Sequence, residues 1–258
     1  MNQLSGSLSG LSSCRIAIAL AGIFFATLAS QCQSDSAALM SGCLATNQQA
    51  LPAELTQTRT LGTKRDQGNP GIGATGRVLQ DIQVTSYPEL AHVDLRVRSF
   101  RSQSDYFRTR FSLYRFLLPM RMRYFVDVNP ALFQEQAPLE GICAILAHEL
   151  AHVVSLSRGN RIRRLGLVRL LSKGQTTKFE RRADLDAIHR GYGDGLKSYR
   201  EWVYVHIPPS KLQEKRRNYF SPEEIAAIEK KLLEQPDLFA YWSEHVPMNL
   251  RAIENGRN

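Results

Sequence analysis

The chain has 258 residues, of which 43% are hydrophobic and 22% charged. This length allows one well-packed catalytic domain with a tail, and the composition excludes a chain that is disordered throughout. The net charge of +9 favours partners that carry negative charge, such as anionic lipid or cell-wall polymer, without selecting one of them.

The N-terminus is predicted to be an export signal. Residues 16–29 form an uninterrupted run of 14 apolar residues behind a weakly basic start, and small residues close the run. A membrane-spanning helix needs about 20 residues, so a signal peptide over residues 1–30, cleaved after residue 29 or 30, is favoured over a retained anchor. The protein is therefore expected in the periplasm or the cell envelope. Lipidation of Cys32 is disfavoured, because Gln31 stands where a lipoprotein signal has a small residue.

The remaining elements follow from composition and periodicity. Residues 31–75 are rich in small, polar and turn-forming residues without periodicity, which predicts a flexible N-terminal region, and residues 76–258 are expected to form one domain with a helical C-terminal extension. The expected fold class is α+β, mostly helical, with a small sheet before the main helix. In chain order we predict a strand at 92–100, a helix at 105–118, a strand at 122–128, and helices at 139–157, 177–192, 196–205 and 222–234.

The four cysteines show no pair with zinc-site spacing. Cys14 leaves with the signal, and Cys32 and Cys43 can pair in an oxidising compartment. Cys143 stands alone in the apolar stretch at 139–157 and is interpreted as a small buried apolar residue.

The strongest chemical signal is the motif His148-Glu149-Leu150-Ala151-His152 inside the helix at 139–157. Residues i and i+4 lie one turn apart on one helix face, so both imidazoles can bind the same zinc ion. Glu149 can take a proton from a zinc-activated water and pass it to the leaving amine. Burying these three polar side chains on so apolar a helix is costly unless a metal compensates, which favours a metal site over two structural histidines.

A catalytic zinc ion needs a third protein ligand. Glu180 is preferred, because it shares a helix face with Asp184, which can accept the free N–H of a zinc-bound histidine. His189 is the alternative ligand. A metzincin pattern fails, because Ser155 and Arg158 occupy its Gly and His positions. One zinc ion per chain is expected.

The two motifs together, H-E-x-x-H and the Glu180-Arg181-Arg182-Ala183-Asp184 segment that starts 28 residues after His152, resemble the HtpX-like and CAAX-prenyl-peptidase-like group of gluzincins over roughly residues 90–200. The resemblance implies a zincin-like fold, zinc ligands His148, His152 and Glu180, the catalytic Glu149 and the supporting Asp184. HtpX-like proteins carry several transmembrane helices, whereas this chain has only its N-terminal apolar segment, so it looks closer to small exported members.

We therefore expect an exported zinc metalloendopeptidase that acts on protein or peptide substrates. The alternative is a non-catalytic, zinc-stabilised chaperone-like or membrane-surface binding module. The intact Glu149 favours the enzyme, because structural zinc usually takes four protein ligands and needs no general base. A group that stabilises the tetrahedral intermediate is also required, and the sequence leaves four candidates unranked: His189, Tyr192, His206 and His245.

Two basic segments bear on partners. Residues 158–178 contain seven Lys or Arg and no acidic residue, interleaved with apolar residues. They suit either peripheral contact with an anionic membrane or an ordinary surface helix that packs its leucines on the domain, and packing is preferred. The arginine-rich stretch 96–123 is not interpreted as a nucleic-acid site, because export disfavours it and alternating strand faces explain the pattern.

Overall fold

The computed structural model describes residues 70–118, 120–158 and 173–257. All of them belong to the compact unit Leu39–Asn258. The predictions for the signal peptide, for residues 31–69, for Cys14, Cys32 and Cys43, and for most of the basic segment 158–178 lie outside the described residues.

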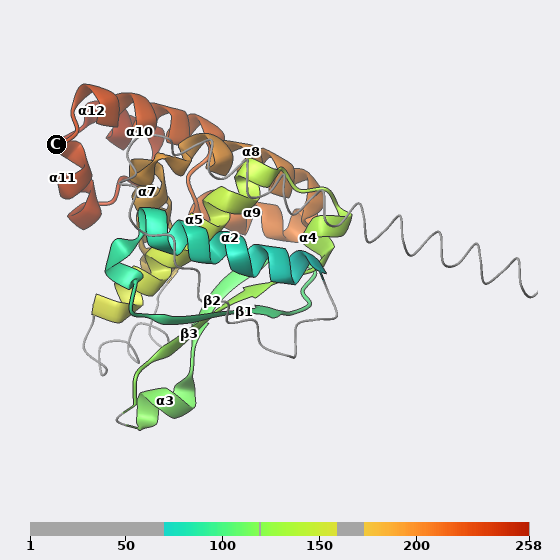
Figure 1. The fold of residues 1–258 in the computed structure, drawn as a ribbon. Helices are drawn as coiled ribbons and strands as arrows, with labels where there is room; N and C mark the ends of the chain where they lie inside the picture. The colour runs from blue at the N-terminus through green and yellow to red at the C-terminus, as the bar shows by residue number, and fades with distance from the viewer. Residues whose placement is uncertain (1–69, 119, 159–172, 258) are drawn as a thin grey trace, which may run out of the picture. The chain divides into compact units, whose positions relative to one another are not determined.

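The described residues combine a small sheet with many helices, so the α+β class and the mostly helical content are confirmed (Figure 1). The strands are β1 (Asp94–Ser99), β2 (Phe107–Phe111) and β3 (Arg123–Val128). The helices are α2 (Pro70–Ser86), η1 (Pro88–Leu90), α3 (Leu113–Leu117), α4 (Ala131–Gln134), α5 (Leu139–Arg158), α7 (Lys173–Ala187), η2 (Ile188–Tyr192), α8 (Gly193–His206), α9 (Pro209–Asn218), α10 (Pro222–Glu234), α11 (Leu238–Glu244) and α12 (Leu250–Asn255).

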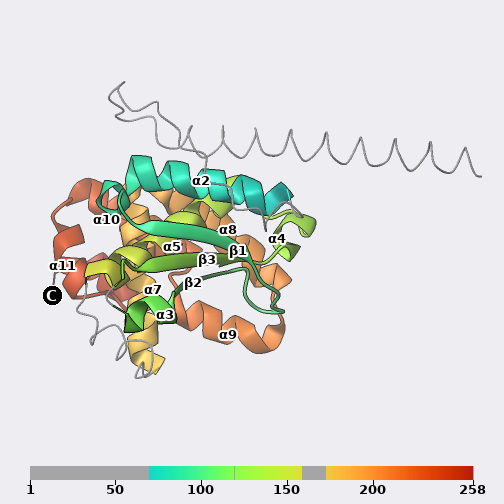
Figure 2. The same ribbon diagram turned by 60° about the horizontal axis from the view of Figure 1, so that its bottom comes forward.

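The sheet has β3 at its centre, with β1 parallel on one side and β2 antiparallel on the other. One face packs against α2 and α5, as Figure 2 shows, and Tyr124 on this face donates a hydrogen bond to the carbonyl oxygen of Leu156 on α5. Because side chains alternate along a strand, the arginines of all three strands fall on the opposite face. The sheet thus separates an apolar interior from a strongly basic outer face.

The central helix α5 explains the apolar stretch around the H-E-x-x-H motif. It is long and apolar enough to cross a membrane, yet 83% of its most apolar window is buried inside the protein. Helix α8 crosses it closely: a Cβ atom at Gly195 would lie 2.4 Å from the carbonyl oxygen of Glu140. Cys143 on α5 is buried, but it is disulfide-bonded, so the expectation that it stands alone was wrong.

The strands predicted at 92–100 and 122–128 are present with slightly shorter bounds, but the helix predicted at 105–118 is wrong. Phe107–Phe111 pairs with β3 along its whole length, and only Leu113–Leu117 is helical. The aromatic residues of this stretch fit both a helical and a strand period. Pairing with β3 decided between them, because it satisfies the backbone groups of a segment rich in Phe and Thr.

Two further boundaries differ from the prediction. Helix α2 begins at Pro70, so the prediction of a flexible region is wrong for residues 70–75. Pro is tolerated in the first turn of a helix. The helix predicted at 177–192 is α7 up to Ala187 followed by the π-helical turn η2, in which Gly191 adopts a φ of +89°. The chain then continues directly into α8.

The C-terminal helices are fastened to α7 by the start of α10. Ser221 accepts a hydrogen bond from the backbone N–H of Glu224, and the Glu224 side chain accepts one from the backbone N–H of Ser221, which together form a capping box. Glu224 also accepts a hydrogen bond from the buried Arg181 of α7 at 2.9 Å. The carboxylate of Glu224 therefore both caps the N-terminus of α10 and neutralises the buried Arg181.

We expect Glu224→Ala to lower the free energy of unfolding by about 3–5 kcal/mol, because Arg181 would keep a buried, unpaired charge. The control Ser221→Ala removes only the cap and should cost about 1 kcal/mol. Urea unfolding of both variants measures the difference. Equal losses for the two would show that the pair with Arg181 contributes nothing.

Candidate metal centre

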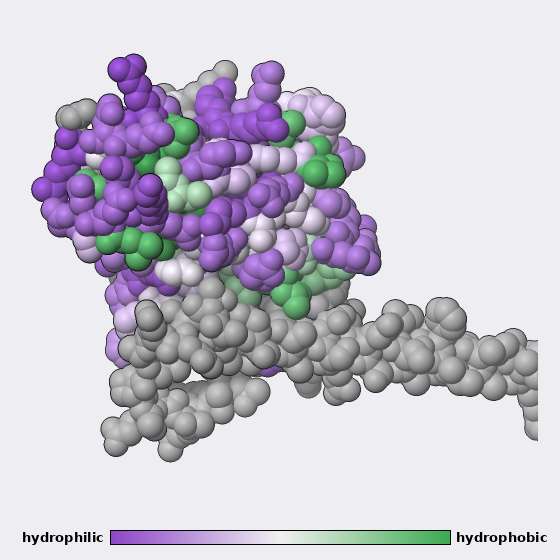
Figure 3. All heavy atoms as spheres, turned by 90° about the horizontal axis from the view of Figure 1, so that it is seen from above, coloured by the Kyte–Doolittle hydropathy of each residue, from purple (hydrophilic) through white to green (hydrophobic). Residues whose placement is uncertain are grey.

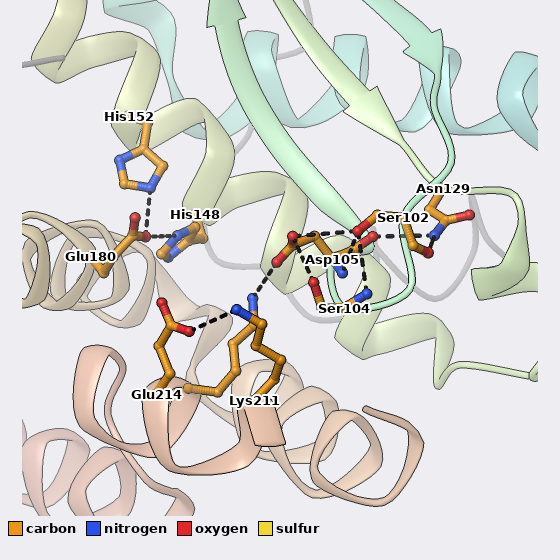
Figure 4. A network of polar contacts seen from close by, with 10 residues as sticks. Ser102, Ser104, Asp105, Asn129, His148, His152, Glu180, Lys211 and Glu214 are labelled. Carbon is orange, nitrogen blue, oxygen red and sulfur yellow. Dashed lines mark hydrogen bonds and ion pairs between the residues drawn. The ribbon is translucent and has the colours of Figure 1, made fainter. Parts of the chain in front are cut away.

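The histidines of the H-E-x-x-H motif meet Glu180 where α5 packs on α7 (Figure 4). Nε2 of His148 and Nε2 of His152 lie 3.3 Å and 3.0 Å from the same atom, Oε2 of Glu180. The three candidate ligand atoms all lie within 4.8 Å of one another, and both histidines are buried. Two imidazole nitrogens and one carboxylate oxygen are the donor set of an open metal site. The cluster can therefore hold a metal ion.

Local packing fixes the two rings. His148 and His152 lie edge to face with ring centroids 4.6 Å apart, and His152 stacks on Phe179 of α7 at 4.5 Å. The small Ala183 is buried on α7, which suits a close approach of the two helices. Side chains one turn apart on α5 thus face side chains of α7, and Glu180 reaches both imidazoles.

Asp184, one turn after Glu180, supports the cluster from behind. Its Oδ1 atom lies 2.7 Å from Nδ1 of His148, which leaves Nε2 of that ring facing Glu180. Asp184 has no exposed surface; Arg200 of α8 donates to its Oδ1 at 2.7 Å, and the backbone N–H of Phe220 donates to its Oδ2 at 3.1 Å. A carboxylate held in this way orients a ligating histidine and raises its basicity.

The electrostatics of the cluster favour a cation. Burial by itself lowers the pKa of His148, but Asp184 and Glu180 outweigh it and raise that pKa to about 9. Burial raises the pKa of Glu180, but His152 and His148 hold it well below its usual range. Burial also raises the pKa of Asp184, but Arg200 and His148 outweigh it and lower that pKa. Without a metal, a proton on His148 supplies the positive charge that the carboxylates require.

This charge balance predicts a pH dependence for the metal-free protein. Since the pKa of His148 is about 9 in the folded chain and about 6.5 unfolded, its contribution to stability is complete below pH 6.5 and is lost as the pH rises through 9. We expect the melting temperature in the presence of chelator to fall between pH 6.5 and 9.5. In Asp184→Asn this fall should shrink, because the main group that raises the pKa of His148 is gone. An unchanged slope in that variant would contradict the assignment.

Glu149 is buried beside the metal cluster and is held by the edge strand β2. Thr109 Oγ1 donates to Oε2 of Glu149 at 2.7 Å and lies 3.1 Å from its carbonyl oxygen. A hydroxyl that donates to one carboxylate oxygen restricts the rotamer of the side chain. The carboxylate is therefore preset in orientation next to the imidazole of His148.

A cavity opens beside Glu149 and His148 and has aromatic walls from Tyr106, Phe107 and Tyr199. Tyr219, at the C-terminal end of α9, completes the lining, and its ring centroid lies 5.8 Å from that of His148. Burial and the nearby Glu180 raise the pKa of Tyr219 well above its usual value, so its hydroxyl keeps its proton. An ion pair between Lys215 of α9 and Asp105, 2.8 Å long, ties α9 to the segment before β2 (Figure 4).

The four residues considered as stabilisers of the tetrahedral intermediate contact other groups. His189, which was also the alternative ligand, stacks on Phe239, and the hydroxyl of Tyr192 bonds Ser86 at 2.8 Å. His206 and His245 each place Nδ1 near the carbonyl oxygen four residues earlier, at 2.8 Å and 3.2 Å. The structure brings none of the four to the lining of the cavity.

Sequence reasoning missed Thr109, Arg200 and Tyr219. Thr109 was placed on a helix, Arg200 was one of many charged residues on a helix, and Tyr219 lies in a stretch without an assigned role. No local signal marked them, because each reaches the centre from a different element. Comparisons of this chain with protein-family models, with curated proteins and with solved structures found no significant match.

Proposed function

We propose that the chain is an exported, zinc-dependent metalloendopeptidase with a zincin-like fold, one zinc ion per chain, and protein or peptide substrates. The observation that carries the proposal is the convergence of His148, His152 and Glu180 beside the preset carboxylate of Glu149. Periplasmic or cell-envelope localisation and membrane contact through residues 158–178 remain predictions from the sequence, as does the expectation that nucleic acid is not a partner.

Zinc is the proposed metal because of the donor set. Two imidazoles and one carboxylate are typical of catalytic zinc, whereas calcium and magnesium prefer oxygen ligands alone. A zinc ion held by three protein ligands supplies a Lewis acid and lowers the pKa of water towards neutrality. The backing of His148 by the buried Asp184 matches the carboxylate–histidine pairs that support such ligands.

The protein groups divide the remaining work. Glu149 accepts the proton of the attacking water and returns it to the leaving amine, and Thr109 holds it in position for both transfers. Tyr219 keeps its proton and lines the cavity next to Glu149, so its hydroxyl is the proposed donor to the oxygen that gains negative charge.

The non-catalytic alternative has less support. A structural zinc site usually provides four protein ligands, whereas the described cluster combines three candidate ligands. A catalytic zinc site would use three protein ligands and bind water as the fourth. A purely structural site would also not need the hydrogen bond that fixes Glu149.

The test is elemental analysis of the purified protein together with digestion of casein and of a broad peptide library. We expect one zinc ion per chain and cleavage that chelator removes and added zinc restores. Full zinc occupancy without cleavage of any substrate would favour the binding module, and absence of bound zinc would overturn the proposal.

A further inference from the structure

The turn between β2 and β3 carries a dense group of exposed apolar side chains. The described part of the chain has ten exposed large apolar residues, and five of them fall within the eight positions 113–120 of this turn. We call them the apolar tip: Leu113, Tyr114, Leu117, Leu118 and Met120. Leu113, Tyr114 and Leu117 have 58%, 68% and 71% of their surface exposed, values that fit solvent-facing polar residues rather than leucine.

The tip is exposed although its helix is well anchored. Phe116 of α3 is buried and packs against Phe111 of β2 with ring centroids 5.7 Å apart, and Ser112 caps the helix. Leu113 and Leu117 are four residues apart and lie one turn from each other on α3, and both are exposed whereas Phe116 is buried. The fold thus holds these leucines outward in a defined arrangement.

The place of the tip in the fold sets it apart from other exposed apolar residues. In Figure 1, α3 lies beyond the ends of β2 and β3, on the side of the sheet away from the helices. The surface on the opposite side of the unit, seen in Figure 3, is mainly hydrophilic, with hydrophobic residues in small separate patches. A dense group of exposed apolar residues on a projecting turn is a candidate interaction site.

A basic surface on the outer sheet face adjoins the tip. Six arginines of the outer sheet face and α3 form ion pairs with only two aspartates, and we call these six residues the arginine collar. Arg96, Arg115 and Arg123 contact Asp94, while Arg98, Arg108 and Arg110 contact Asp127. Six arginines against two aspartates leave four positive charges. Asp127 has no exposed surface, whereas its three arginine partners are 41–50% exposed. At Asp127 the negative charge is therefore inside and the positive charge faces outward.

We propose that the apolar tip and the arginine collar dock the protein on an anionic lipid bilayer. The tip projects from the sheet, and a bilayer accepts a projecting apolar group without a matching groove. Leucine side chains enter the acyl region, and Tyr114 suits the interface, where its ring is apolar and its hydroxyl stays wet. Arginine binds phosphate with two parallel hydrogen bonds, so the collar fits the headgroups of acidic lipids. None of the residues of the tip or the collar belongs to the basic segment 158–178.

Docking would set the orientation of the candidate site. Strand β2 ends next to the tip, and the same strand carries Thr109, which bonds Glu149. A bilayer at the tip would therefore bring the cavity close to the membrane and favour substrates that are membrane-anchored or lie at its surface. This last consequence rests on the proposed peptidase function, whereas the docking itself does not.

The test is a fluorescence measurement on the full chain with Tyr114→Trp. Vesicles contain either phosphatidylglycerol or phosphatidylcholine, with brominated acyl chains that quench nearby indole rings. The matched control is Val205→Trp, at a side chain 81% exposed on α8. We expect Tyr114→Trp to gain a blue-shifted emission that phosphatidylglycerol vesicles quench, above the signal of the two native tryptophans, and Val205→Trp to gain none. Any insertion of residues 16–29 in the vesicle would act on both tryptophan variants, so the difference between them reports the tip.

A second arm tests the collar in the Tyr114→Trp background. Arg110→Gln leaves Asp127 with two arginine partners and should weaken lipid-dependent quenching about fivefold, while the exposed Arg251→Gln on α12 should leave it unchanged. Tip quenching no greater than in Val205→Trp, or equal on both lipids, would overturn the proposal. Neither arm needs zinc or hydrolysis, so failure here is distinguishable from failure of the peptidase proposal.

Discussion

Glu149→Gln should abolish nearly all peptide hydrolysis while zinc content and fold stay as in the wild type. The amide has almost the same size and can still accept the hydrogen bond from Thr109. It cannot take up a proton, so the general-base step is lost, and general-base assistance is worth about 10²- to 10⁴-fold. The loss can exceed this range, because the same carboxylate also protonates the leaving amine.

The measurement pairs zinc stoichiometry with the cleavage rate of a peptide that the wild type hydrolyses. Glu140→Gln is the matched control, since it makes the same change on the same helix at an exposed position in the first turn. Its rate should remain close to that of the wild type. If Glu149→Gln and the wild type cleave equally well, Glu149 is not the base and the proposed mechanism is wrong.

Glu180→Ala should lose the zinc ion and, with it, the hydrolysis. The variant removes one of the three candidate ligands and leaves two imidazoles that share no carboxylate. Removal of a supporting group such as Asp184 typically weakens metal affinity 10- to 100-fold, and loss of a direct ligand should weaken it more. Competition with a chromophoric chelator gives the affinities of the wild type, Glu180→Ala and Asp184→Asn on one scale.

His189→Ala serves as the control for this series, because His189 was the other candidate third ligand and stacks on Phe239. Its zinc affinity should match that of the wild type. Full zinc occupancy in Glu180→Ala, or zinc loss in His189→Ala, would overturn the ligand assignment. A stable fold without zinc in Glu180→Ala would also show that the metal is not needed to hold α5 and α7 together.

The two helices of the candidate metal centre were predictable because their signals are local. His148 and His152 share a face of α5 through their spacing alone, and Glu180 and Asp184 share a face of α7 in the same way. The strong apolar character of residues 139–157 likewise predicted a buried helix. That the two faces meet is a tertiary fact, and the structure supplies it as a pair of contacts to one oxygen atom of Glu180.

Other parts of the site depend on contacts between residues far apart in the chain. Thr109 and Glu149 are 40 positions apart, and Phe220 and Asp184 are 36 apart, so no periodicity or spacing connects them. Strand β2 shows why this matters: its residues fit a helix equally well, and only pairing with β3 made them a strand and turned Thr109 towards Glu149.

By itself, the sequence determined the metal-binding residue types, their helical spacing and the mostly helical class, because helix periodicity is a property of neighbouring residues. Only the tertiary structure decided which side chains complete the centre and which apolar residues face solvent. Leu113 and Leu117 look like core residues in the sequence, yet the sheet ends before them and no helix covers them in the described part of the chain. Burial depends on what packs against a residue, and packing is set by the whole fold.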